Sequence, residues 1–322
     1  LHPRVRRQRQ MCIRDRISNE KMDDLCHTLK EFAQIMESYK VIAYKAYGTS
    51  AIRETENALI LQDQIEQRTG IRVEILSNSE QRFLDYKSIA SKGETFRRII
   101  EEKTAILDIG GGSIQISLFD KDTLVSTQNL RLGVLRLQEL LNHLNAGSTQ
   151  MEQLVDELAT AQLDDYKKLY LKDREIKNII IVDDYLSPWA VRKAHERGDG
   201  NAMVDSKAFD QLMEALRARG TTELAKRMDI AEEKVPLVYI SAVLTKRIAE
   251  LMGAALIWAP GVTLCDGIAY EYAEQNKLLR GEHDFAEDII ACAMNISKRY
   301  NGSTRSCLLY TSPSPRDGLL SR

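Results

Sequence analysis

Long apolar runs and paired cysteines are missing from this sequence of 322 residues. No apolar run reaches the roughly 18 residues of a transmembrane helix, so a membrane protein is not expected. Cys26, Cys265 and Cys292 are far apart in the sequence, which excludes zinc-finger spacing and a disulfide framework. We therefore expect buried free thiols and a cytoplasmic location. With 43% apolar and 29% charged residues, the composition is that of a globular protein of one or two domains.

The two ends of the chain differ from the rest in composition. Residues 1–16 hold six arginines without an apolar period, and residues 307–322 contain the run SPSP. The strings MCIRDR and CLLYTSPSPRD resemble the translation of a sequencing adapter, so we interpret both ends as non-native tails and expect the natural protein to continue beyond them. The remaining residues hold 37 basic and 45 acidic side chains, a formal charge of −8. Nucleic acid is not expected as a partner, because its binding needs a basic face.

Apolar periodicity predicts an alternation of helices and strands. Helices are expected from Asn19 onward and over 58–68, 79–90, 133–144, 149–171, 206–219, 221–228, 237–252, 265–279 and 284–299. Strands are expected over 41–44, 72–76, 105–107, 114–118, 124–130, 178–182 and 255–258. Such an alternation predicts an α/β fold with a mixed sheet.

Breaks in the pattern predict the domain organisation. The helix expected over 79–90 ends at a Ser-Lys-Gly break, after which we place the boundary between a first lobe, 17–102, and a second lobe, 103–282. Residues 283–306 then form either the start of a helical C-terminal domain or a helix that docks on the second lobe.

An acidic residue and a glycine turn carry the clearest chemistry. Asp108 ends an apolar strand and is followed by Gly110, Gly111, Gly112 and Ser113. Glycine lets the backbone approach an oxyanion, and successive N–H groups can form an anion-binding nest. The aspartate is a candidate ligand for a divalent cation. The alternative is a plain β-hairpin with a glycine-rich turn. Neither the dinucleotide fingerprint nor the Walker pattern is present.

Further motifs occur in a fixed order around this turn. They are TSAIRE from Thr49, ILSNSEQ from Ile75, DIGGGS from Asp108 and LGVLRL from Leu132, with weaker EKV and DGIAY strings later. In this order, over about residues 17–282, the sequence resembles the Ppx/GppA family of exopolyphosphatases and guanosine pentaphosphate phosphohydrolases. The resemblance implies a two-lobed actin-like ATPase fold, like that of sugar kinases and heat-shock chaperones, with ribonuclease H-like lobes. It also implies Mg²⁺, polyphosphate or guanosine polyphosphate as substrate, and a homodimer.

The resemblance assigns roles to individual residues. Asp108 would be the metal ligand and the carboxylate that orients water, and residues 110–113 the phosphate loop. Arg53 would reach a substrate phosphate, for which its planar fork is suited. The alternative for Arg53 is a structural salt bridge at a helix start. Glu80 lies in the segment that supplies the catalytic carboxylate of the family, which removes a proton from water or aligns it.

Three departures weaken the match. Gln81 aligns with the catalytic glutamate of the family and is carried over as a catalytic position beside Glu80 and Asp108. Gln115 aligns with a second glutamate, and a neutral amide is a very poor base. After the strand over 178–182 the chain has Asp183 and Asp184 in place of a Gly/Thr turn. We expect that pair in a solvated loop, with a metal site as the alternative. The opening strand and first phosphate loop of the family should precede residue 17.

Three functions follow from these residues. The first is Mg²⁺-dependent hydrolysis of a terminal phosphate, with water aligned by Glu80 and Asp108 and phosphate held by Arg53 and the turn. The second is a catalytically weak or inactive sensor of polyphosphate or guanosine polyphosphate, which Gln81 and Gln115 favour. The third, an ATP-dependent kinase of small molecules, is disfavoured by the missing Gly/Thr turn.

Overall fold

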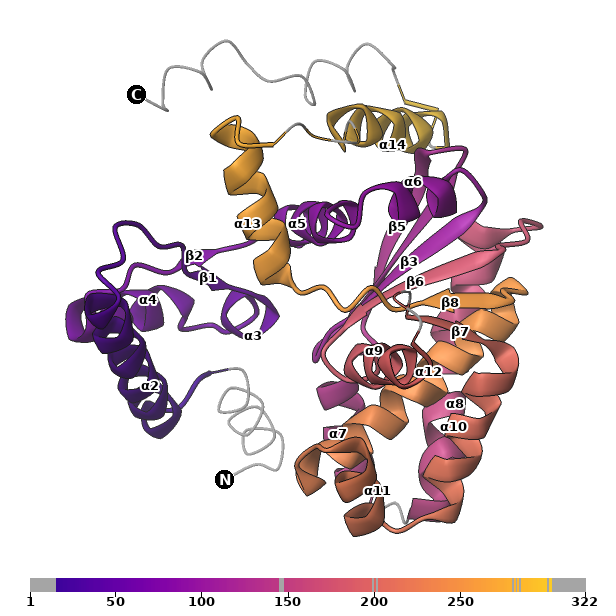
Figure 1. Cartoon of the computed structure of the whole chain (residues 1–322), viewed down its shortest axis with the longest axis horizontal. Helices are drawn as coiled ribbons and strands as arrows, with labels where there is room; N and C mark the ends of the chain where they lie inside the picture. The colour runs from indigo at the N-terminus through magenta and orange to yellow at the C-terminus, as the bar shows by residue number, and fades with distance from the viewer. Residues whose placement is uncertain are drawn as a thin grey trace, which may run out of the picture. The chain divides into compact units, whose positions relative to one another are not determined.

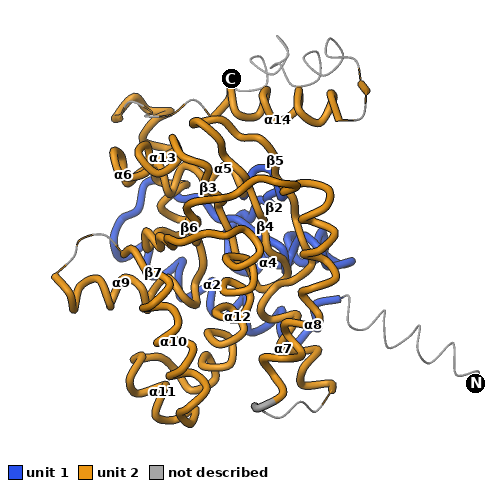
Figure 2. The backbone as a smooth tube through the Cα atoms, turned by 90° about the vertical axis from the view of Figure 1, so that its right-hand side faces the viewer, with its two compact units in different colours: residues 1–81 blue, residues 82–322 orange. Residues whose placement is uncertain are grey.

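The chain forms two compact units, residues 1–81 and 82–322 (Figure 2). A computed structural model describes residues 16–144, 148–198, 200, 202–279, 281, 283, 285–299 and 301–302. The predicted tails fall almost wholly outside these residues. The division between units lies after Gln81, whereas the lobe boundary was placed after Glu102. Compact units and lobes are different divisions, so the lobe boundary stays a prediction.

The first unit is built from two helices packed face to face. Its elements are α2 (Asn19–Ser38), β1 (Tyr47–Gly48), α3 (Ser50–Arg53), α4 (Ala58–Thr69) and β2 (Glu74–Ile75). Met22 and Cys26 of α2 pack against Leu61 and Ile65 of α4 to form the core. Gly70 ends α4 in the left-handed conformation, as glycine does most easily. Strands β1 and β2 pair in parallel.

The second unit is organised around a six-stranded mixed sheet (Figure 1). Its strands are β3 (Thr104–Ile109), β4 (Ile114–Asp120), β5 (Thr123–Leu130), β6 (Asn178–Asp183), β7 (Met203–Asp205) and β8 (Leu256–Trp258). Their order in the sheet is β5-β4-β3-β6-β8-β7. β6 pairs in parallel with β3 and β8, whereas β3–β4, β4–β5 and β7–β8 are antiparallel. The expected mixed α/β sheet is confirmed.

Helices pack on both faces of this sheet, and further helices pack on these. They are α5 (Asn78–Ala90), α6 (Glu94–Ile100), α7 (Val134–His143), α8 (Ser148–Tyr166), α9 (Ser187–Glu196), α10 (Ser206–Ala218), α11 (Thr221–Met228), α12 (Val235–Met252), α13 (Leu264–Gln275) and α14 (Phe285–Arg299). Alternate residues of β3 face opposite sides. Leu107 packs in the core that α7, α8, α10 and α12 share, and Ile106 packs in the core that α5, α6 and α14 share. Asp108 lies next to last in this central strand, near its carboxyl end.

Several sequence expectations were wrong in detail. No strand covers 41–44; Ile42 is fully exposed, and Tyr44 instead donates to Gly70 O and accepts from the Arg72 N–H. Helix α13 ends at Gln275 and not at residue 279. Helices α3, α6 and α9 and strands β1 and β7 were not predicted, because each is short or begins at a polar segment.

The cysteines and the membrane expectation can also be compared with the structure. Cys26 and Cys292 are buried free thiols as expected, but Cys265, in the first turn of α13, is exposed. Among the described residues, no helix combines the length and the apolar character that a membrane crossing requires.

Candidate active site

The glycine turn is the tip of the hairpin that joins β3 to β4. Strand pairing places Asp108 opposite Gln115 and Ile109 opposite Ile114. The Gly110 N–H donates to the Ser113 carbonyl at 3.0 Å and closes the turn. The hairpin alternative is therefore correct as local structure. It does not exclude anion binding, because the turn residues are partly exposed.

The start of α7 is bonded to the outside of this turn. The Val134 N–H donates to Gly110 O at 3.0 Å, and the Arg136 N–H donates to Gly111 O at 3.1 Å. The Arg136 side chain adds a bond from Nε to Gly112 O at 3.1 Å. The carbonyls of all three glycines are thus occupied. Within the part of the chain that the structure describes, the N–H groups of Gly111 and Gly112 donate no hydrogen bond. Two backbone donors therefore remain available to an anion.

Gly133 makes this close approach geometrically feasible. A Cβ atom at Gly133 would lie 2.1 Å from Gly112 C, 2.2 Å from Gly111 O and 2.3 Å from Ser113 N. Since all three are backbone atoms, a side chain at position 133 would push the turn away from α7. The LGVLRL motif is therefore a packing requirement of the DIGGGS turn.

Asp108 is hydrogen-bonded to a second carboxyl group that sequence reasoning missed. Burial is the largest cause that raises the pKa of Asp108, to about 6, and a hydrogen bond from Asp85 in α5 opposes that rise. Burial and the neighbouring Asp108 raise the pKa of Asp85 well above its ordinary value. Burial and the nearness of Asp108 thus both disfavour the ionised form of Asp85. The only sequence signal was an Asp between the apolar Leu84 and Tyr86 on the buried face of a helix.

Gln115 connects Asp108 to the guanidinium group of Arg82. Its Nε2 donates to Asp108 Oδ2 at 3.0 Å, and its Oε1 accepts from Arg82 Nε at 2.9 Å. Gln115 is buried, and both ends of its side-chain amide form hydrogen bonds within the protein. The side chain orients the Asp108 carboxyl and cannot accept a proton itself.

The remaining candidates lie in the first unit. Arg53 Nη1 donates to Leu76 O at 2.6 Å and to Gln81 Oε1 at 3.4 Å, so its partners here are a carbonyl and an amide. Glu80 forms a capping box at the start of α5: its Oε2 accepts from the Ser77 N–H at 2.8 Å, and its own N–H donates to Ser77 Oγ. The Ser77 N–H bond lowers the pKa of Glu80. The structure brings Arg53 and Gln81 together; the catalytic and phosphate-binding roles stay predictions.

Asp183 does not lie in a solvated loop, which corrects the expectation. Its Oδ2 accepts from the Leu186 N–H at 2.8 Å and from Ser241 Oγ at 2.9 Å, and its Oδ1 accepts from the Ser187 N–H at 2.7 Å. Asp183 is buried and fixes the start of α9, whereas Asp184 is exposed. In the described residues, no group of three or more His, Cys, Asp or Glu could hold a metal. A metal would have to be held by fewer carboxylates together with substrate and water, as Mg²⁺ often is.

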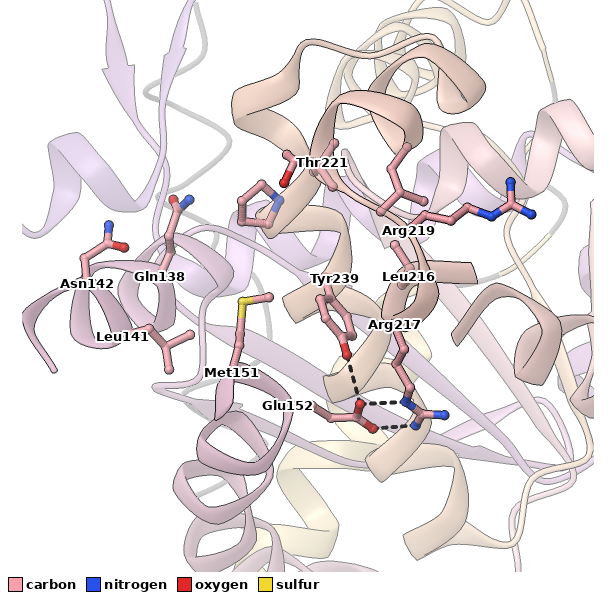
Figure 3. Close-up of a pocket in the computed structure, with 13 residues that line it drawn as sticks. Gln138, Leu141, Asn142, Met151, Glu152, Leu216, Arg217, Arg219, Thr221 and Tyr239 are labelled. Atoms are coloured by element: carbon pink, nitrogen blue, oxygen red, sulfur yellow. Dashed lines mark hydrogen bonds and ion pairs between the residues drawn. The ribbon is translucent and has the colours of Figure 1, made fainter. Parts of the chain in front are cut away.

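A separate cavity of about 490 Å³ lies among the helices of the second unit (Figure 3). Arg217 makes a two-pronged ion pair with Glu152 there, and Tyr239 donates to the same carboxylate at 2.9 Å. Arg219, at its rim, pairs with Glu223. Because both arginines already have carboxylate partners, this cavity offers no free positive charge to a phosphate.

Comparison with known proteins finds a matching family and related sequences. Residues 5–275 match the model of the Ppx/GppA phosphatase family. A segment of 103 residues is 32% identical to exopolyphosphatase 1 of Mycobacterium leprae, covering 32% of this chain and 29% of that protein. A segment of 162 residues is 23% identical to a bifunctional 3-dehydroquinate synthase/phosphatase of Fusobacterium nucleatum, covering 48% of this chain and 24% of that protein. The chain thus spans less than a third of the length of these curated relatives.

Solved structures show the fold. An exopolyphosphatase from Cytophaga hutchinsonii superposes with a TM-score of 0.64 at 20% identity, covering 81% of this chain and 84% of that one. The Aquifex aeolicus member of the Ppx/GppA family gives the same TM-score and coverage at 15% identity. The actin-like α/β fold expected from the resemblance is confirmed. With a family model matched over most of its length, the chain belongs to the Ppx/GppA phosphatase family.

Proposed function

We propose that this chain hydrolyses the terminal phosphate of inorganic polyphosphate, with guanosine pentaphosphate as the second candidate substrate. The observation that carries the proposal is the glycine turn, whose two open N–H donors lie at the end of the strand that holds Asp108, beside Asp85 of α5. Family membership and the exopolyphosphatase relatives support the same chemistry. Polyphosphate or guanosine polyphosphate as partner, a homodimer and a cytoplasmic location are further parts of this proposal.

The residues at the turn suit the tasks that phosphoryl transfer sets. The N–H groups of Gly111 and Gly112 would hold phosphate oxygens as charge develops on them. Asp108 would hold Mg²⁺ and orient the attacking water; its half-buried carboxyl group, which accepts from Gln115 Nε2 and lies beside Asp85, is an oxygen donor of the kind that Mg²⁺ takes. Mg²⁺ bound there would neutralise negative charge on the phosphate chain. Arg53 and Glu80 would add a phosphate contact and a water contact.

Phosphate release from long-chain polyphosphate tests the proposal. We expect Mg²⁺-dependent release by this chain, or by the reading frame restored from genomic DNA, and its loss in Asp108→Ala. Asp184→Ala is the matched control, because Asp184 is an exposed carboxylate. Release that persists in Asp108→Ala would contradict the assignment. A parallel assay with guanosine pentaphosphate distinguishes the two substrates.

One observation favours a sensor as the second candidate. Gln115 uses both amide ends in internal hydrogen bonds, and Gln81 is likewise neutral, so neither can serve as a base. Saturable binding of polyphosphate, with phosphate release no faster than the uncatalysed rate, would support the sensor over the hydrolase. A kinase has no such observation in its favour.

A further inference from the structure

We propose that Asp85 is a second carboxylate ligand for the divalent cation, so that the cation site is formed jointly by α5 and the end of β3. The inference rests on the proposed function, because it extends the site in which Asp108 holds Mg²⁺. Its starting point is the buried Oδ2 atom of Asp85, which has no hydrogen-bond partner and belongs to a carboxyl group that neighbours Asp108.

Asp85 is buried in a way that ordinary structural roles do not explain. The residue is 3% exposed, and its Oδ2 atom has no hydrogen-bond partner. Among the described residues, Asp85 forms no ion pair, although Arg82 lies one turn earlier on the same helix and donates its Nε–H to Gln115. A buried carboxylate oxygen without a partner costs stability, and a buried charge without a partner costs more. A bound cation would give the oxygen a partner and would balance the charge of the carboxylate.

The neighbouring acids behave differently, which makes Asp85 the specific candidate. Asp183 is also buried, but its oxygens already accept three hydrogen bonds from Leu186, Ser187 and Ser241. Asp184 is exposed and contributes only charge at a distance. Among the acidic residues that the structure describes, Asp85 alone combines a buried oxygen without a partner and a position beside Asp108.

The chemistry of the pair matches what Mg²⁺ takes from proteins. Mg²⁺ is usually held by one or two carboxylates, with water and substrate phosphate completing its shell. Asp85 and Asp108 supply two carboxylates, and Gln115 orients one of them through its Nε2 donor, as outer-shell partners of metal sites do. The open N–H groups of Gly111 and Gly112 follow at the end of the same strand, where a bridging phosphate would bind.

Cation binding without substrate tests the inference. Mn²⁺ serves as the probe, measured by electron paramagnetic resonance and by the Mn²⁺-induced rise in melting temperature of the full chain. We expect Asp85→Asn to weaken Mn²⁺ binding by about tenfold or more, since losing even an outer-shell partner costs that much. Asp108→Asn should do the same, and Asp184→Asn should change little.

Folding of the variants is part of the test. Because the buried Oδ2 of Asp85 has no hydrogen-bond partner, Asp85→Asn and Asp85→Ser should melt no lower than the unmodified chain in EDTA. Variants that fail to fold would show that Asp85 stabilises the metal-free core, and would overturn the inference.

The outcomes separate this inference from the proposed function. Mn²⁺ binding that is lost in Asp108→Asn but unchanged in Asp85→Asn would overturn the role of Asp85 and leave Asp108 as the ligand. Absence of Mn²⁺ binding in the unmodified chain would overturn the inference whatever the phosphate-release assay shows. Binding that depends on both aspartates would support the inference even if polyphosphate is not hydrolysed.

Discussion

Replacing Gly133 with alanine should disrupt the phosphate turn from outside it. Gly133 precedes α7 with extended backbone angles, φ −66° and ψ 149°, that any residue can adopt. The cost of Gly133→Ala therefore comes from space and not from backbone strain. The new Cβ would meet three backbone atoms of the turn at 2.1–2.3 Å, whereas ordinary contacts lie at 3.4–4 Å.

The magnitude follows from these contacts. Relief requires the turn and α7 to separate by about 1 Å, because backbone atoms cannot rotate away as a side chain can. Overpacking typically costs about 1–3 kcal/mol, and three backbone overlaps place this change at the upper end, about 3 kcal/mol. For a unit of this size, 1 kcal/mol corresponds to about 2–4 °C in melting temperature, so we expect a drop of about 6–12 °C. Separation would also weaken the bonds from Val134 and Arg136 to the turn.

Gly220→Ala is a closely matched control. Gly220 precedes α11 with φ −70° and ψ 156°, and a Cβ there meets nothing within 4 Å. Both variants remove a glycine N-cap, so their difference isolates the contact with the turn. Thermal melts monitored by circular dichroism and filter binding of labelled polyphosphate provide the measurements. Equal melting temperatures and equal polyphosphate binding in the two variants would refute the reasoning.

Other predictions concern the supports of the second unit. Asp183→Ala should lower stability by about 2 kcal/mol or more in urea unfolding, because its three buried donors lose their acceptor; an unchanged midpoint would contradict this. Hydrogen bonding to Arg217 lowers the pKa of Glu152 below its ordinary value of 4.5. The ionised carboxylate therefore stabilises the folded state fully above pH 4.5, and this stabilisation is lost as the pH falls through the lowered pKa. The difference in melting temperature between the unmodified chain and Glu152→Gln should therefore shrink in acid. Asp288→Asn should loosen α14, since Asp288 accepts from the Leu124 N–H at 2.9 Å, and faster hydrogen exchange over 285–299 would show it.

The fold was largely predictable because its strands bury themselves in regular patterns. The continuous apolar run of β6 and the alternation in β4 are visible in the sequence, and both strands lie within a residue or two of their expected bounds. The segment after Val182 was misjudged because its polarity looks like that of a loop. Only the tertiary contact with Ser241, distant in the chain, shows that Asp183 is a buried acceptor.

The candidate site was predictable in part. Asp108 and the four turn residues stand out locally, because three consecutive glycines after a strand let the backbone approach an oxyanion. Asp85 was not identified, since in the sequence it is a single polar residue within the apolar pattern of a helix. Its meaning depends on contact with β3, which no local pattern encodes.

The bonding of α7 to the turn has a consequence for how relatives can change. Bulk added at Gly111 would meet the tip of Leu135, a flexible and half-exposed side chain, so a smaller residue at position 135 could compensate. Bulk added at Gly133 has no such remedy, because it would meet backbone atoms of the turn, which every residue type retains. In a screen for second-site revertants, substitutions at position 135 should therefore rescue Gly111 variants, whereas no turn substitution should rescue Gly133 variants.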